Sequence, residues 1–177
     1  MKIAIIGYSG AGKSTLAEKL SHYYSIPKLH MDTLQFQPGW QDSDREWMLG
    51  EMKNFLTRHE AWVIDGNYSW CCYEERMQEA DQIIFLNFSP WTCLFRAFKR
   101  YLIYRGKVRE SMAAGCPERF DWEFIRWILW DGRTKNAKVR YQQVQKTYLE
   151  KVIVLRSQKK MDYFLENLVH NKKNQRV

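Results

Sequence analysis

The first fifteen residues combine glycines, a lysine and a serine at a spacing suited to binding phosphate groups. An apolar stretch at 1–6 leads into Gly7-Tyr8-Ser9-Gly10-Ala11-Gly12-Lys13-Ser14-Thr15, and a helical pattern follows at once. A strand, a glycine-rich loop and a helix in this order form a phosphate-binding loop. The backbone N–H groups and the positive end of the helix then face the ligand together. We predict that ATP is bound by Gly7, Ser9, Gly10, Ala11, Gly12, Lys13, Ser14 and Thr15.

Within this loop, two side chains have separate expected roles. Lys13 can reach the β- and γ-phosphates of the nucleotide and is assigned a catalytic role, while the Ser14 hydroxyl can ligate Mg²⁺. The alternative is a glycine turn with a solvated lysine, but the flanking strand and helix favour the nucleotide site.

Two aspartates directly follow expected strands. Asp32 comes after a strand at 26–29, and Asp65 ends a strand at 61–65. Ligands of open parallel sheets bind at the carboxyl ends of the strands, so both carboxylates should lie near the phosphates. There an aspartate can order Mg²⁺ or accept a proton from an attacking hydroxyl. We predict catalytic roles for both, with Asp65 and Ser14 as metal ligands; a helix cap or a turn carboxylate is the alternative.

The second half of the chain contains arginines that can neutralise the negative charge that develops on a phosphate group during its transfer. Arg100 lies in an expected helix and Arg109 in the loop that follows, and we predict that both are catalytic. The alternative is a solvated basic face. Further candidates are Arg96, Arg105, Arg119 and Arg133.

A second substrate would bind near the two aspartates. Residues placed there by sequence order are Trp40, Trp47, Asn67 and Tyr68, and an aromatic ring among them could stack on a base or a sugar. The alternative is that they belong to the core. Of the histidines, only His30 is close enough to Asp32 to be of interest.

The elements that must position these residues alternate between strand and helix, which is typical of an α/β protein with a parallel sheet. We expect strands at 1–6, 26–29, 61–65, 82–87 and 151–155. Ser43 to Glu46 fits a capping box at the start of a helix. In the helix after Ser89, one face carries Trp91, Leu94, Phe95, Phe98 and Leu102. The segment 122–130 is apolar on nearly every side and is expected to be buried or packed under the basic loop 105–120. The tail from 171 is expected to fray.

Composition limits the class of protein. A chain of 177 residues with 45% hydrophobic and 15% aromatic residues should form one folded domain. The net charge of +8 is uneven: residues 1–90 hold 8 basic and 12 acidic side chains, and residues 91–177 hold 20 and 8. A basic half can attract nucleic acid or supply arginines to a phosphoryl-transfer site. The four cysteines lack metal-site spacing, and we expect no signal sequence and no transmembrane stretch. These features predict a cytoplasmic protein without a membrane partner. We expect a monomer or a homodimer.

Taken together, these motifs resemble the nucleoside-monophosphate-kinase-like P-loop proteins, and most closely the adenylate-kinase-like DNA topology modulation proteins. The matching pieces are 7–15, Asp32 with 38–40, 65–68, and 115–121 with Trp127. The resemblance implies a three-layer α/β/α fold with a parallel sheet in the order 2-3-1-4-5. It also implies ATP and Mg²⁺ binding and an arginine-rich lid at about 103–121.

Two departures from adenylate kinases bear on the acceptor. Asn67-Tyr68 replaces the usual Phe-Pro-Arg after the Asp-Gly pair, which puts AMP in doubt as the acceptor. Ser14-Thr15 is more like kinases that phosphorylate a hydroxyl. The chain is therefore expected to be an ATP-dependent phosphotransferase with a small-molecule or nucleotide acceptor. A nucleotide-regulated DNA-binding protein that affects DNA topology, and an ATPase with water as acceptor, remain alternatives.

Overall fold

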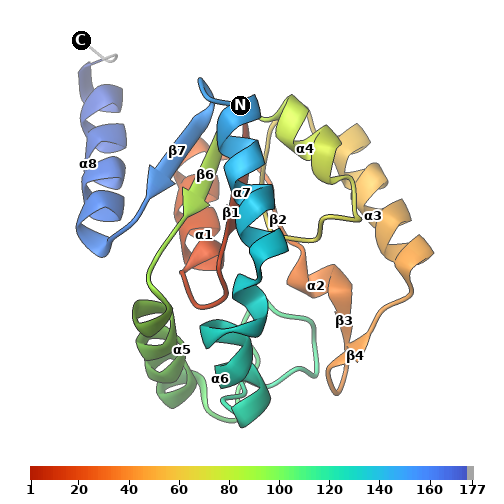
Figure 1. Ribbon diagram of the computed structural model, residues 1–177. Coiled ribbons are helices and arrows are strands. Elements are labelled where there is room, and N and C mark those ends of the chain that lie inside the picture. Colours follow the sequence, from red (N-terminus) through yellow and green to blue (C-terminus); the bar gives the residue numbers. More distant parts are fainter. Residues whose placement is uncertain (175–177) are drawn as a thin grey trace.

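The computed structural model describes residues 1–174, and its centre is a five-stranded parallel sheet (Figure 1). In spatial order the strands are β2 (Lys28–His30), β5 (Trp62–Asp65), β1 (Lys2–Gly7), β6 (Gln82–Leu86) and β7 (Val152–Leu155). Numbered within the sheet, this order is 2-3-1-4-5, as predicted. The inner strands consist almost entirely of buried residues, because helices cover both faces of the sheet.

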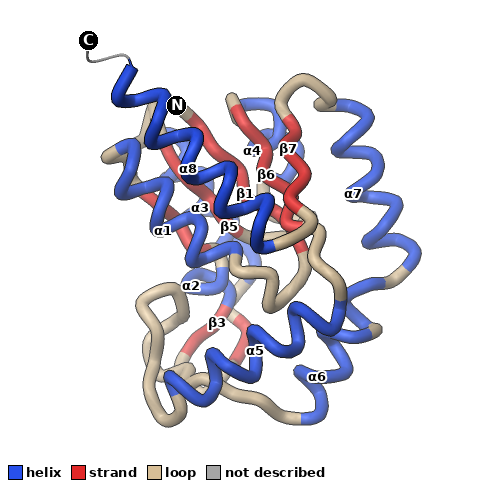
Figure 2. Tube along the Cα trace, turned by 90° about the vertical axis from the view of Figure 1, so that its left-hand side faces the viewer, coloured by secondary structure: helices blue, strands red, loops and turns tan. Residues whose placement is uncertain are grey.

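Helices form the outer layers of the α/β/α arrangement. Figure 2 shows α1 (Lys13–Tyr24) and α8 (Gln158–Asn174) on one face of the sheet, and α4 (Tyr73–Glu79) and α7 (Lys135–Thr147) on the other. Helix α3 (Arg45–Arg58) lies beyond the edge strand β2 (Figure 1). The aromatic residues Tyr8, Phe85 and Tyr141 pack together between the sheet and α7. Because α1 follows β1 after the short loop 8–12, its amino end lies at the carboxyl edge of the sheet.

Beyond that edge lie the elements that cover the phosphate loop. They are α2 (Asp32–Gln35), the hairpin of β3 (Phe36–Gln37) and β4 (Gln41–Asp42), α5 (Pro90–Tyr104), α6 (Trp122–Leu129) and the 3-10 helix η1 (Asp131–Arg133). The loop 105–121 joins α5 to α6. Its buried residues Met112 and Cys116 form a second small core with Phe36 and Trp40 of the hairpin.

The structure corrects several local predictions. Strand β2 begins at Lys28 and not at residue 26, and Asp44 rather than Ser43 caps α3, by accepting a hydrogen bond from the Trp47 N–H. Helix α8 continues to Asn174, so most of the tail expected to fray is helical, and residues 175–177 lie outside the described residues. In the described chain, none of the helices is both long and apolar enough to cross a membrane.

Of the two placements expected for 122–130, burial in the core is wrong for most of the segment. In α6 only Ile128 is buried, whereas Trp122, Trp127 and Trp130 are each at least half exposed. Ile128 joins the main core and Phe124 packs against it, whereas the rest of α6 packs on α5 and η1 at the edge of the molecule.

Candidate nucleotide-binding site

The phosphate loop connects β1 to α1 and depends on glycine at two positions. Gly7 and Gly10 have φ angles of 143° and 77°, and a Cβ atom would lie 2.5 Å from the carbonyl oxygen of Leu86 or Cys93, respectively. A larger residue would therefore strain the backbone and displace its neighbours. Ala11 is fully buried, and its N–H donates to the Tyr8 carbonyl over 3.1 Å. The loop is thus held in a compact turn at the amino end of α1.

Lys13 and Ser14 begin α1, so both lie at the positive end of this helix. Lys13 Nζ donates to the Tyr8 carbonyl of the loop over 3.4 Å, a long hydrogen bond that a phosphate oxygen can replace. Thr15 is exposed on the next position of the helix. The predicted loop residues are therefore together, with Lys13 directed back over the loop.

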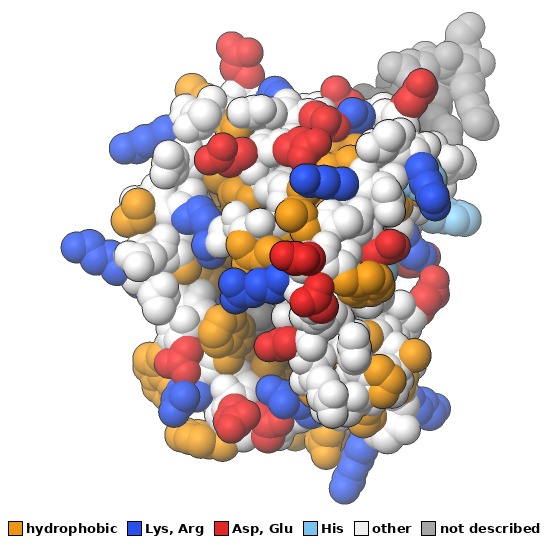
Figure 3. All heavy atoms as spheres, turned by 90° about the vertical axis from the view of Figure 1, so that its right-hand side faces the viewer, with side chains coloured by type: hydrophobic (Ala, Val, Ile, Leu, Met, Phe, Trp, Pro, Cys, Tyr) orange, Lys and Arg blue, Asp and Glu red, His pale blue; other side chains and the backbone are white. Residues whose placement is uncertain are grey.

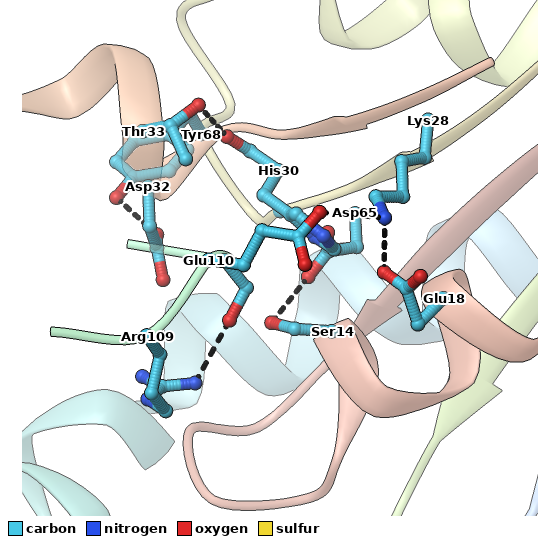
Figure 4. A network of polar contacts seen from close by, with 12 residues as sticks. Ser14, Glu18, Lys28, His30, Asp32, Thr33, Asp65, Tyr68, Arg109 and Glu110 are labelled. Atoms are coloured by element: carbon cyan, nitrogen blue, oxygen red, sulfur yellow. Dashed lines mark hydrogen bonds and ion pairs between the residues drawn. The ribbon is translucent and has the colours of Figure 1, made fainter. Parts of the chain in front are cut away.

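Asp65 connects the phosphate loop to β2. Its Oδ2 accepts a hydrogen bond from Ser14 Oγ over 2.9 Å, and its Oδ1 contacts His30 Nδ1 (Figure 4). Asp65 is only 4% exposed, so its orientation is determined by these two partners. The contact between Ser14 and Asp65 brings together two residues that are 51 positions apart in the sequence.

This pair suits Mg²⁺ by its chemistry, since both side chains offer oxygen ligands. Among residues 1–174, no three His, Cys, Asp or Glu side chains are grouped to hold a metal ion by themselves. A Mg²⁺ ion at Ser14 and Asp65 would therefore need further oxygens from phosphates and water, as is usual for nucleotide-bound Mg²⁺.

Asp32 is positioned by Tyr68. The Tyr68 hydroxyl donates to Asp32 Oδ1 over 2.7 Å, and burial, followed by the charge of Asp32, raises the pKa of this phenol. Tyr68 therefore stays protonated and acts as a donor. No hydrogen bond to Asp32 Oδ2 occurs among the described residues. In Figure 4 the Asp32 carboxylate points to the side on which Ser14 and Arg109 lie.

Arg100 and Arg109 meet at one buried carboxylate. Arg100 Nε donates to Glu118 Oε1 over 2.7 Å, and Arg109 Nε donates to Glu118 Oε2 over 2.5 Å. The Glu118 side chain is 4% exposed. Burial, and then the neighbouring Arg109, lowers the pKa of Arg100, while Glu118 and Asp32 oppose this shift. Two guanidinium groups share one carboxylate, so the cluster carries an excess positive charge on the side of Asp32.

The remaining arginine candidates have different places. Arg96 Nη1 donates to the Ala11 carbonyl of the phosphate loop over 2.5 Å, and Arg133 stacks on the ring of Tyr8 with its Cζ 3.8 Å from the centroid. Arg105 is exposed, and Arg119 pairs with Asp121 over 3.3 Å. Only Arg96 and Arg133 thus contact the loop.

Several contacts of the loop were not predicted. Asn67, considered for the second substrate, instead accepts from the Gly7 N–H over 3.0 Å and donates to the Gly7 carbonyl. Trp127 Nε1 donates to Ser9 Oγ over 3.0 Å from α6. Glu118 was also missed, although an acidic residue within a basic segment that holds two candidate arginines is a usable signal.

The hairpin and the loop 105–121 are joined over the site. The Gly39 N–H donates to the Gly115 carbonyl over 3.0 Å, and Trp40 Nε1 donates to the Pro117 carbonyl over 3.2 Å. Trp40 therefore belongs to this junction. Trp47, 49% exposed on α3, does not take part in it.

The turn that carries Asp65 and Tyr68 rests on a buried arginine. Arg76 has no exposed surface and donates to the carbonyls of Gly66 and Tyr68 over 3.4 and 3.1 Å. Burial lowers the pKa of its guanidinium to about 10, so the group remains charged at neutral pH.

Replacing Arg76 should destabilise the protein. Arg76→Met leaves buried carbonyl groups without donors, and we expect the free energy of unfolding to fall by about 3 kcal/mol. Urea denaturation measures this change. Arg58→Met, at the exposed end of α3, is the matched control. Equal stability of the two variants would contradict the role given to Arg76.

Comparison with known proteins supports the fold. The chain matches no family model and no curated protein, so the resemblance to DNA topology modulation proteins remains a prediction. Among solved structures, it is similar to a deoxyadenosine kinase from M. mycoides, solved with the products dCMP and a flexible dCDP (TM-score 0.53, 19% identity, 100% of both chains). It is also similar to a gluconokinase from Sinorhizobium meliloti 1021 (TM-score 0.50, 18% identity, 98% of this chain and 96% of the other). The chain therefore has the α/β fold of P-loop kinases.

Proposed function

We propose that this protein is an ATP-dependent phosphotransferase whose acceptor is a small molecule with a hydroxyl group. The observation that carries the proposal is the Ser14–Asp65 hydrogen bond at the phosphate loop, together with a second aspartate, Asp32, held nearby by Tyr68. One carboxylate is thus in place for a nucleotide-bound metal and the other for a second substrate. The kinase names of both structural neighbours agree with this proposal.

In this proposal the triphosphate lies in the loop 7–15, with Lys13 at the β- and γ-phosphates. Ser14 and Asp65 would hold Mg²⁺, which when bound neutralises charge on the same phosphates. Asp32 Oδ2 accepts the proton of the acceptor hydroxyl as its oxygen attacks the γ-phosphorus, and ADP leaves. Tyr68 keeps Asp32 in position during this step.

Arg100 and Arg109 supply the positive charge for the transferred group. Both are largely buried and are held by Glu118, so their orientation is set before substrate binds. Donors that are fixed in advance stabilise the charge of the transition state at little cost of reorganisation. Figure 3 shows acidic and basic side chains interspersed around a hollow on the face that carries α3 and α4. Such a mixed surface suits a polar small molecule.

The DNA-binding alternative has less support. The arginines of the basic half that lie nearest the phosphate loop are engaged within the protein, since Arg100 and Arg109 pair with Glu118 and Arg96 donates to the Ala11 carbonyl. Nucleic acid requires cations that are free to replace the counterions of its phosphates.

A screen of ATP consumption tests the proposal. The protein would be mixed with ATP and Mg²⁺ and with panels of nucleosides, nucleotides, sugars and hydroxy acids, and duplex DNA would be a separate additive. We expect one class of hydroxyl-bearing small molecule to raise ADP release above the rate with water alone. A rate unchanged by every acceptor would favour a bare ATPase, and stimulation by DNA alone would favour the DNA-binding alternative; either result would contradict the proposal.

A further inference from the structure

Helix α5 exposes its most apolar face to solvent. Trp91, Phe95, Phe98 and Leu102 follow one another at helical spacing and are 70%, 68%, 43% and 58% exposed. We call these four residues the α5 stripe. A row of large apolar side chains on the surface is typical of an interaction site.

The opposite side of α5 shows that the stripe does not serve the core. The buried residues of the helix are the small Cys93 and Ala97, while Arg96 and Arg100 extend to the phosphate loop and to Glu118. The helix therefore turns small and charged residues inward and Trp91 and Phe95 outward, while Phe98 is partly covered by Phe120 of the loop 105–121, with ring centroids 5.2 Å apart. Figures 1 and 2 both place α5 at the edge of the molecule, and no element of residues 1–174 covers its outer side.

The charge around the stripe has one dominant sign. Residues 90–109 contain six basic side chains and no acidic one. Of these, Lys99, Arg105 and Lys107 are exposed. In the neighbouring segment 110–131, four of the five acidic residues contact a cation, and Glu123 is the one without an ion pair. The surface beside the stripe is therefore apolar and positively charged.

This combination selects among possible partners. A second copy meeting the same face would bring a second set of cations to the contact, with Glu123 the one acidic residue of segment 110–131 that has no ion pair among the described residues. Duplex DNA would use the cations at its phosphates and leave the aromatic side chains without a role, because its bases are already stacked on one another. A membrane with anionic lipids satisfies both features, because Trp, Phe and Leu enter the interface while Lys and Arg remain at the headgroups.

We propose that α5 is a peripheral membrane-binding helix that docks on anionic lipid through the α5 stripe, with Lys99, Arg105 and Lys107 at the headgroups. Such a contact needs no membrane-spanning helix. It differs from the expectation drawn from the sequence, which was that the protein has no membrane partner. It is independent of the proposed catalytic function. Because few side chains insert, binding should be reversible and should weaken as salt is raised.

Vesicle flotation with the full chain tests this proposal. We expect at least about fivefold more protein on phosphatidylcholine vesicles that contain phosphatidylglycerol than on pure phosphatidylcholine. Trp91→Ser combined with Phe95→Ser should reduce the binding at least about tenfold. Tyr163→Ser is the matched control, since Tyr163 is an equally exposed aromatic residue on α8.

The charge contribution is tested separately. Lys99→Gln combined with Lys107→Gln should remove most of the preference for anionic vesicles, whereas Lys138→Gln on the exposed side of α7 should not. Unchanged thermal unfolding of all variants shows that they are folded. Equal recovery of the protein on anionic and neutral vesicles would overturn the proposal. It would also be overturned if the protein binds no vesicles and instead self-associates or binds DNA in a way that the Trp91/Phe95 variant loses.

Discussion

Lys13→Ala should reduce ATP turnover by at least about 100-fold, because the ammonium group at the amino end of α1 is the main cation available to the β- and γ-phosphates. Lys13 Nζ has only the Tyr8 carbonyl as a partner in the loop, at 3.4 Å, so its removal should leave the fold intact. ADP release by the purified variant, together with calorimetric titration of ATP, measures the effect on rate and on affinity.

Lys19→Ala is the matched control for this variant. Lys19 lies on the same helix but is exposed, and no site contact depends on it. Wild-type rates and affinities are expected for Lys19→Ala. Unchanged ATP affinity and rate in Lys13→Ala would contradict the assignment of the phosphate loop.

Asp32→Asn should lower kcat for phosphoryl transfer by about 100- to 10,000-fold while ATP affinity stays nearly constant. The amide cannot accept the proton of the acceptor hydroxyl, and ATP is held by other residues. Steady-state kinetics with the acceptor found in the screen, and ATP titration, separate these two effects.

Tyr68→Phe distinguishes proton acceptance from positioning. This variant keeps the Asp32 carboxylate but removes its hydrogen bond of 2.7 Å, so the loss of kcat should be smaller than in Asp32→Asn. Full activity of Asp32→Asn would remove Asp32 from the mechanism. If Tyr68→Phe were as inactive as Asp32→Asn, the loss of kcat would come from the position of the Asp32 carboxylate and not from its acceptance of a proton.

The sheet could be predicted because its signals are local. Each inner strand is a short apolar run, and burial on both faces requires such a run. Asp65 could be expected near the phosphate loop because it ends a strand, and the strand order implied by the family resemblance puts that strand beside β1. The hydrogen bond between Asp65 and Ser14 is observed in the structure.

The covering elements could not be predicted in the same way. The hairpin 36–42 and the loop 105–121 are joined by contacts between residues about 76 positions apart, such as Gly39 and Gly115. Short segments rich in glycine and proline carry no periodic pattern that shows which partner they meet. An acidic residue in this basic segment is a signal for Glu118, but which two arginines it meets depends on how the loop packs against α5.

The exposure of α6 shows a limit of composition as a guide. A run with tryptophan at 122, 127 and 130 is apolar enough for a core, but burial depends on what packs against it. In this protein the core takes in Ile128, and Phe124 packs against it. The three tryptophans of this run are not part of this core and remain on the surface.

A crystal structure with Mg²⁺ and a non-hydrolysable ATP analogue tests the central claim most directly. We predict that the β- and γ-phosphates lie within the loop 7–15, with Mg²⁺ beside Ser14 and Asp65 and with Arg100 or Arg109 directed at the γ-phosphate. An analogue bound elsewhere, or a loop that remains without phosphate at saturating analogue, would contradict the account.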